Sequence, residues 1–172
     1  ARADIGQMSN TSGDLVDMRH PETESVDEIC RNLTGPLVNA GNGSGQHPTQ
    51  ALLDWYTLLK WRPQLGFETC GKEDQIHLGI VGTPGSMRYA KSFDTLALLF
   101  PPSVRTITIV SEMADPVGLD LEADVNESPI PIEYTNDIQE VLGDLDVIYM
   151  NSIALLGDSY KKLDSRYKLD AQ

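Results

Sequence analysis

The sequence has no long hydrophobic run, few cysteines and little positive charge. No stretch approaches the roughly 18 consecutive apolar residues of a membrane-spanning helix. The first residues, ARADIGQMSN, also lack the basic and then apolar layout of a signal peptide. We therefore expect a soluble, cytoplasmic protein without a membrane partner.

The two cysteines, Cys30 and Cys70, lie far apart and outside any Cys-x-x-Cys spacing. Such an arrangement encodes neither a disulfide framework nor a zinc site. We expect two free structural thiols, no bound metal and no other cofactor.

Charge limits the partners of the chain. It carries 13 Lys and Arg against 26 Asp and Glu, a formal net charge of -13. Nucleic acids and anionic lipids require clustered cations, so this balance argues against both. A small anion is still compatible with it, wherever a few cationic side chains converge on the N-terminus of a helix.

Strand and helix patterns alternate along the chain, which at 172 residues is long enough to bury a core. Strands are predicted within residues 14–21, 35–41, 76–82, 104–111, 129–135 and 146–152. Helices are predicted within residues 3–12, 24–33, 48–62, 87–100 and 136–145. This order predicts an α/β fold, with parallel sheets flanked by helices and ligands at the carboxyl ends of the strands.

Three local features refine the predicted helices. Ser25 and Glu28 have the spacing of a capping box, and Asn136 is the expected cap of the last helix. A buried stripe is expected on the helix within residues 48–62, formed by Leu52, Trp55, Tyr56 and Leu59.

The first strand end with a cation is DMRHP, where Arg19 stands just before a proline turn. A cation at this place can hold an anionic ligand. It can equally form a surface ion pair with Glu22 or Glu24, and the residues alone leave both interpretations open.

The stretch VNAGNGSGQHPTQALLD, residues 38–54, places three glycines before a helix. Glycine allows a sharp turn and a close approach of the backbone to a ligand. His47 and Gln50 are three positions apart and share one helical face, where an imidazole and an amide suit a carbonyl or carbamoyl group. A glycine turn followed by a capped helix is the plain alternative. The G-x-G-x-G spacing is not the dinucleotide-binding pattern.

Two later strand ends carry further polar residues. The turn with Gly82 and Gly85 places Arg88 near the start of a helix. A carboxylate clasp by Arg88 is one interpretation, and it suits the turn better than a nucleotide site, which would need the Lys-Ser/Thr of a phosphate loop. The last strand end offers Asn151 and Ser152, which supply hydrogen bonds but no charge.

With DMRHP, NAGNGSGQHPTQALLD, GIVGTPGSMRYAKS and DVIYM in this order, the chain resembles the aspartate carbamoyltransferase family, within the aspartate/ornithine carbamoyltransferase superfamily. His-Pro-Thr-Gln after the glycine turn is the specific part of this resemblance. The resemblance implies a two-domain carbamoyltransferase architecture. Residues 1–46 would belong to the carbamoyl-phosphate-binding domain and residues 47–172 to the amino-acid-binding domain, both partial, with the helix after His47 as the joint.

The resemblance also implies an activity, namely transfer of the carbamoyl group from carbamoyl phosphate to the amine of an amino acid, aspartate in the family, early in pyrimidine synthesis. Arg19 would contact the phosphate, His47 the carbonyl oxygen and Gln50 the carbamoyl nitrogen. Arg88 would hold a carboxylate of the acceptor. His47 and Arg19 would be the catalytic residues, because they stabilise the developing oxyanion and the departing phosphate. A homotrimer with sites between subunits is implied, and a regulatory subunit is left open.

The chain departs from the family pattern in two ways. The Ser-Thr-Arg-Thr-Arg phosphate loop, the mobile loop with serine and lysine, and the C-terminal His-Pro-Leu-Pro segment have no counterpart. We therefore expect an internal fragment of a larger enzyme, with little or no activity of its own. In addition, the family's Met-Thr-Arg-x-Gln becomes Met-Asn-Ser-Ile-Ala, so Ser152 and Ala154 stand where Arg and Gln would hold aspartate.

Three hypotheses follow from the match and the departures. The whole protein is an aspartate carbamoyltransferase, or a carbamoyltransferase with a different acceptor, or a catalytically silent homologue with a role in assembly or regulation. The four retained residue types at strand ends favour a transferase. The replaced clamp at Ser152 and Ala154 favours the other two hypotheses.

Overall fold

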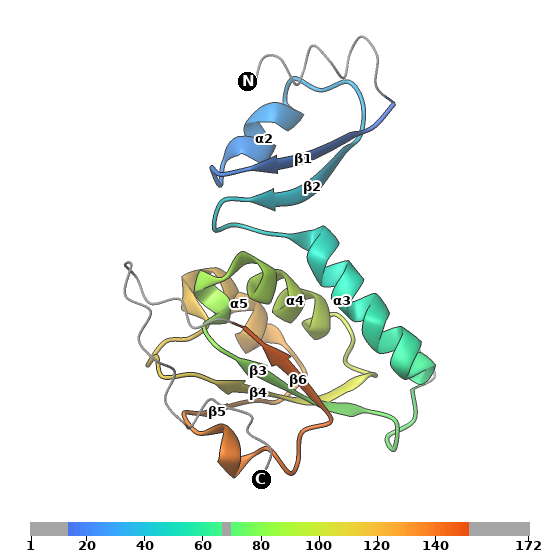
Figure 1. Cartoon of the computed structure of the whole chain (residues 1–172), viewed down its shortest axis with the longest axis vertical. Coiled ribbons are helices and arrows are strands. Elements are labelled where there is room, and N and C mark those ends of the chain that lie inside the picture. Colours follow the sequence, from blue (N-terminus) through green and yellow to red (C-terminus); the bar gives the residue numbers. More distant parts are fainter. Residues whose placement is uncertain (1–13, 67–69, 152–172) are drawn as a thin grey trace.

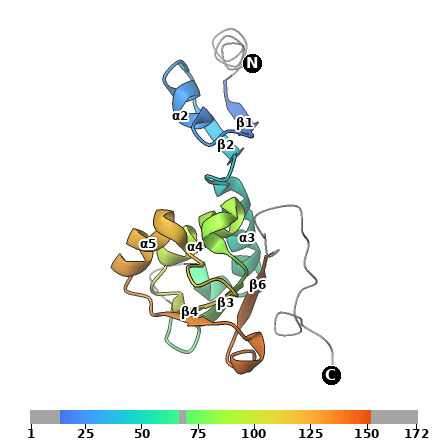
Figure 2. The same cartoon turned by 90° about the vertical axis from the view of Figure 1, so that its left-hand side faces the viewer.

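The computed structural model describes residues 14–66 and 70–151, which form two parallel sheets joined by a long helix (Figure 1). The first sheet contains β1 (Val16–His20) and β2 (Leu37–Asn42), connected by α2 (Ser25–Cys30). Figure 2 shows this small unit standing at the end of the long helix, apart from the larger sheet. The helix expected within residues 3–12 lies outside the described residues.

The second unit contains the larger sheet. Its elements are α3 (Pro48–Trp61), β3 (Ile76–Val81), α4 (Arg88–Leu98), β4 (Val104–Val110), α5 (Gly118–Glu127), β5 (Ile132–Thr135) and β6 (Val147–Met150), with short 3-10 turns η1 (Pro63–Gly66), η2 (Pro84–Ser86) and η3 (Ile138–Glu140). The strand order is β5-β4-β3-β6, and every neighbouring pair is parallel. The predicted α/β fold with parallel sheets is therefore confirmed.

The strand order changes direction at β3. The chain leaves β3 for β4 and β5 on one side and returns to β6 on the other side. In sheets of this kind, ligands bind at the carboxyl ends of the strands beside such a reversal. A ligand is therefore expected at the ends of β3 and β6 and at the loop that follows β3.

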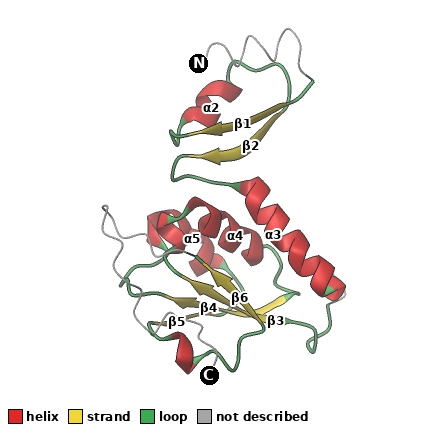
Figure 3. Cartoon of the chain, in the orientation of Figure 1, coloured by secondary structure: helices red, strands yellow, loops and turns green. Residues whose placement is uncertain are grey.

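The main core lies on one face of the larger sheet, beneath α3, α4 and α5 (Figure 3). Its buried side chains come from the sheet and from all three helices, including Leu78, Ile107, Trp55, Phe93 and Leu121. A smaller cluster around Val81, Val110 and Ile138 covers part of the other face. Because both faces are covered, every residue of β3 is buried, as its continuous apolar pattern predicts.

The predicted stripe on α3 is wrong in part. Ala51 and Trp55 are buried, but Leu52 and Tyr56 are each 57% exposed. The buried face follows positions 51, 55 and 59, of which Leu59 is partly buried. The buried face of α3 is therefore rotated by about one residue from the predicted face. The contacts of α3 with α4 and the sheet decide which side of the helix faces the core.

Two predicted helix caps are also wrong. Ser25 is the first residue of α2 and not its N-cap, and its hydroxyl donates to the carbonyl of Glu22 at 2.6 Å. The helix expected within residues 136–145 is only the turn η3, whose cap is Asp137, which accepts from the amide of Gln139 at 2.9 Å. That segment must also carry the chain from β5 to β6, at opposite edges of the sheet, so only one turn becomes helical.

The sequence prediction missed α5, and its composition explains why. The segment GLDLEADVNE is rich in acidic residues, and among its apolar side chains Leu121 alone is fully buried in the structure. The hydrophobic period is therefore weak. Elsewhere, Cys30 and Cys70 are free thiols, and none of the described helices combines the length and the apolar character needed to cross a bilayer.

Candidate functional site

The glycine turn after β2 has a backbone that only glycine adopts readily. Gly41 has a φ of 117° and Gly43 a φ of 53°, both in the left-handed region. A Cβ on Gly43 would lie 2.8 Å from the carbonyl oxygen of Pro21. The side chain of Asn42 fixes the turn by donating to Thr23 O at 2.5 Å and accepting from the amide of Gln46 at 3.0 Å. The turn therefore lies directly against the segment that follows β1.

His47 is the N-cap of α3. Its Nδ1 accepts from the backbone amide of Gln50 at 3.3 Å. Burial lowers the pKa of His47, and the positive charges of Arg88 and Arg19 lower it further. The imidazole is therefore neutral at pH 7, and because Nδ1 is an acceptor, its proton lies on Nε2. His47 can thus donate one hydrogen bond to a ligand from Nε2.

Arg88 begins α4 and reaches back to the glycine turn. One terminal nitrogen donates to the carbonyl of Gly43 at 2.8 Å. A Cβ on Gly41 would lie 3.3 Å from both Arg88 Nε and His47 Cδ2, so the guanidinium and the imidazole flank the same glycine. The structure thus brings the N-termini of α3 and α4 together at one turn.

Arg19 lies at the end of β1 and its side chain is exposed. Its positive charge contributes to the lowered pKa of His47, and its neighbour His20 pairs with Asn42 at the end of β2, so Arg19 lies near the glycine turn. All four residues expected from the sequence, including Gln50 one turn further along α3, therefore gather around the end of β2.

Sequence reasoning missed two residues of α4 that hold this turn. Lys91 is 3% exposed, and its ammonium donates to the carbonyl of Ser44 at 3.4 Å. Ser92 accepts from the amide of His47 at 2.8 Å and donates to the side-chain carbonyl of Gln46. Both follow Arg88 by three or four positions, the spacing of one helical face, and that spacing was the only signal available.

A second polar group links α3 to the sheet. Asp54 accepts from the side-chain amide of Gln50 at 2.9 Å and from the hydroxyl of Tyr149 on β6 at 2.6 Å. No sequence pattern indicated this contact.

The ends of β3 and β6 lie side by side, since the amide of Asn151 donates to Val81 O at 2.9 Å. Here the hydroxyl of Thr83 and the side-chain oxygen of Asn151 are buried, and neither has a hydrogen-bond partner among the described residues. Buried polar atoms are normally satisfied, so a polar ligand at this edge would remove an energetic cost. Ser152 and Ala154, the replaced clamp positions, lie outside the described residues.

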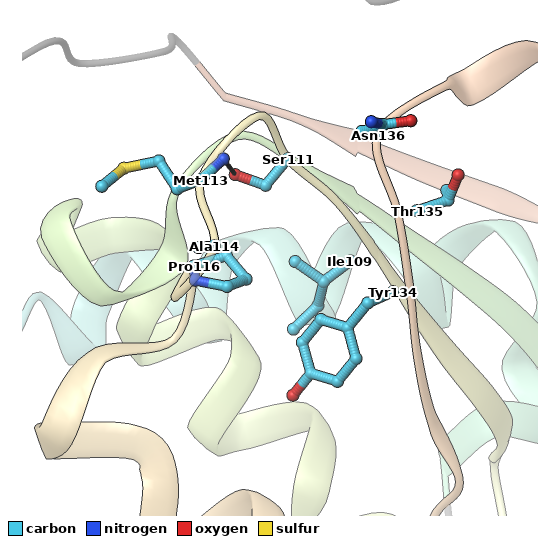
Figure 4. A pocket seen from close by; sticks show the side chains of 8 residues that line it. All are labelled: Ile109, Ser111, Met113, Ala114, Pro116, Tyr134, Thr135 and Asn136. Carbon is cyan, nitrogen blue, oxygen red and sulfur yellow. Dashed lines mark hydrogen bonds between the residues drawn. The ribbon is translucent and has the colours of Figure 1, made fainter.

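A cavity of about 420 Å³ lies elsewhere, at the carboxyl ends of β4 and β5 (Figure 4). It is lined by Ile109, Ser111, Met113, Ala114, Pro116, Tyr134, Thr135 and Asn136. None of the predicted site residues lines it. Within residues 14–66 and 70–151, no cluster of His, Cys, Asp or Glu is placed to hold a metal ion.

Comparison with known proteins gives independent information. Residues 2–60 match the family model described as aspartate/ornithine carbamoyltransferase, carbamoyl-P binding domain. The aspartate carbamoyltransferase catalytic subunit of Methanoculleus marisnigri is 30% identical over 158 residues, which cover 88% of this chain and 47% of that protein. The corresponding subunit of Thermoplasma volcanium is 31% identical over 155 residues, covering 88% and 46%.

A solved structure agrees with these relatives. Aspartate transcarbamoylase from Trypanosoma cruzi, in complex with carbamoyl phosphate and aspartate, matches with a TM-score of 0.70 and 28% identity. The match covers 87% of this chain and 46% of that chain. The chain thus spans about half the length of the proteins it matches.

Proposed function

Because this chain is similar to aspartate carbamoyltransferase catalytic subunits, we propose that the whole protein transfers the carbamoyl group of carbamoyl phosphate to the amine of an amino acid. The observation that carries this proposal is the convergence of His47 and Arg88 on Gly41, with Gln50 one turn away. Two cationic or donor groups and an amide at one glycine turn suit a small ligand that bears a carbonyl, an amide nitrogen and negative charge.

Each side chain has a proposed role that matches its donors and acceptors. His47 donates from Nε2 to the carbonyl oxygen of the carbamoyl group, and Arg19 holds the phosphate. Gln50 binds the carbamoyl nitrogen. Arg88 uses one of its five N–H donors on Gly43, so the others are available for a carboxylate of the acceptor.

The proposed reaction needs no covalent enzyme intermediate. The amine attacks the carbamoyl carbon, the new C–N bond forms, and the C–O bond to phosphate breaks. The proton lost by the amine can leave with the phosphate. His47 stabilises the negative charge that develops on the carbonyl oxygen, and Arg19 stabilises the charge of the departing phosphate.

The finer features implied by the family are part of the same proposal. Residues 1–46 would contribute to the carbamoyl-phosphate-binding domain and residues 47–172 to the amino-acid-binding domain, with α3 as the joint. The whole protein would act as a homotrimer in the cytoplasm, in pyrimidine synthesis where aspartate is the acceptor.

The acceptor is aspartate or another amino acid. Ser152 and Ala154 carry no charge, which favours an acceptor that does not need a second cationic clamp. The unpartnered oxygens of Thr83 and Asn151 add to this argument, because they offer neutral hydrogen bonds at the same edge of the sheet.

Isothermal titration of the whole protein tests the proposal. Carbamoyl phosphate is added first, and a panel of amino acids that includes aspartate is then added to the saturated protein. We expect heat from carbamoyl phosphate and then from one amino acid, which names the acceptor. A folded protein that gives no heat with carbamoyl phosphate would overturn the proposal in favour of a silent homologue.

A further inference from the structure

The carboxylate of Asp54 connects the first turns of α3 to the edge strand of the larger sheet. Oδ1 accepts from Gln50 Nε2 at 2.9 Å, and Oδ2 accepts from the hydroxyl of Tyr149 at 2.6 Å. Gln50 and Asp54 are four positions apart on α3, whereas Tyr149 lies 95 positions after Asp54 on β6. Each carboxylate oxygen therefore has one defined donor.

Tyr149 is held firmly enough to orient its partner. It pairs with Ile80 across β3 and β6. Its ring stacks on the buried ring of Phe93, with centroids 4.0 Å apart and an angle of 7° between the planes. Burial and the hydrogen bond to Asp54 raise the pKa of Tyr149, so the hydroxyl remains a proton donor throughout the physiological range.

The contact with Asp54 decides which way the Gln50 amide faces. A carboxylate accepts hydrogen bonds and donates none, so the NH₂ group of the amide must point toward Asp54. The amide oxygen Oε1 consequently points away from it. Among the described residues, no group donates to Oε1. The site therefore presents an acceptor to the ligand at this place, not a donor.

We propose that Asp54 and Tyr149 are positioning residues that hold the Gln50 amide with its oxygen toward the ligand, and so select a carbamoyl group over an acetyl group. This inference rests on the proposed function. The NH₂ of carbamoyl phosphate can donate to Oε1, whereas the methyl group of acetyl phosphate cannot. The two ligands otherwise share the carbonyl and the phosphate.

The test compares the affinities of the whole protein for carbamoyl phosphate and for acetyl phosphate. We expect the wild-type protein to prefer carbamoyl phosphate by about tenfold, the size of one good hydrogen bond. Tyr149→Phe keeps the ring on Phe93 and removes the hydroxyl. We expect it to weaken carbamoyl phosphate binding by several-fold, up to about tenfold, and acetyl phosphate binding by less than about twofold.

Tyr56→Phe is the matched control, because Tyr56 lies on α3 with its side chain largely exposed. We expect it to leave both affinities unchanged. Asp54→Ala removes the same link from the other end and should reduce the preference to a similar extent. Asp54 is only partly buried, so this variant decides the matter if Tyr149→Phe does not fold.

The outcomes separate the two proposals. If both variants lose affinity for the two ligands equally, the link is only structural and the inference is overturned. If both variants keep the wild-type preference, Asp54 and Tyr149 do not position Gln50. If the wild-type protein binds neither ligand, the proposed function fails, and the inference fails with it.

Discussion

The two sheets are stabilised in different ways. The larger sheet packs three helices against one face and buries a continuous set of aliphatic and aromatic side chains. The small unit of β1, α2 and β2 buries few large apolar side chains, among them Met18 and Ile29. A two-stranded sheet is marginal on its own in water. Its position therefore depends on contacts with the rest of the chain.

Those contacts are mostly polar, and they come from α4. Arg88, Lys91 and Ser92 bond to the backbone of the turn after β2, at Gly43, Ser44 and His47. The same residues lie in or beside the candidate site. The larger unit is thus stabilised by its hydrophobic core. The candidate site lies where hydrogen bonds from α4 hold the turn of the smaller unit.

The largest expected effect concerns the core of the larger unit. Phe93→Ala should lower the free energy of unfolding by about 3–5 kcal/mol, because it leaves a cavity beside Trp55 and Tyr149. Ile29→Ala in the small unit should cost about 2 kcal/mol, the low end for its type, since Ile29 belongs to neither cluster of buried hydrophobic side chains. Denaturant unfolding of both variants measures the difference. Equal losses would contradict the contrast between the two units.

The next effect concerns catalysis at the junction. His47→Ala in the whole protein should lower kcat by about 10²–10³, because the oxyanion loses its Nε2 donor. It should also lower stability by about 1 kcal/mol, since the N-cap of α3 is lost. Steady-state kinetics and thermal unfolding check the two effects separately. Turnover at the wild-type rate would remove His47 from the catalytic role.

The third prediction concerns how the stability of the larger unit depends on pH. Burial of Asp94 on α4 raises its pKa from 3.8 to about 7, and neither of its oxygens has a partner among the described residues. The folded state then holds a proton that the unfolded state releases. Stability should therefore fall as pH rises from about 4 to about 7, by at most about 1.4 kcal/mol per pH unit, and should level off above that range.

Asp94→Asn tests this dependence, because an amide of similar shape cannot ionise. The variant should lose the fall in stability between pH 4 and 7 and be more stable than the wild type at pH 8. Urea unfolding at several pH values is the measurement. A wild-type slope that persists in the variant would assign the effect to other groups.

The smallest effect tests the turn itself. Gly41→Ala should cost about 1 kcal/mol, since φ is 117° and the new Cβ would press on Arg88 and His47. The variant should also lower kcat/KM by a larger free-energy equivalent than its loss of stability, because Arg88 and His47 are both site residues. Gly143→Ala is the control, since a Cβ there meets nothing within 4 Å. Similar behaviour of the two variants would show that the close approach at Gly41 is unimportant.

Local patterns in the sequence predicted the strands and most of the helices. The alternation of elements, the buried pattern of β3 and the start of α3 at Pro48 are confirmed. The errors are the missed helix α5, the helix expected within residues 136–145, two helix caps and the inward face of α3. The hydrophobic period of α5 is too weak to detect, and the other errors depend on where a segment meets its neighbours, which side-chain spacing does not contain.

The glycine turn with His47 and Gln50 was evident from the sequence, because backbone freedom and helical spacing are properties of neighbouring residues. The contact of Arg88 with Gly43 and the link from Asp54 to Tyr149 were not, since these pairs are 45 and 95 positions apart in the sequence. Only the order of strands and the packing of α3 on α4 bring those residues within hydrogen-bonding distance. The chemistry of the candidate site is thus encoded locally, and its geometry is set by tertiary packing.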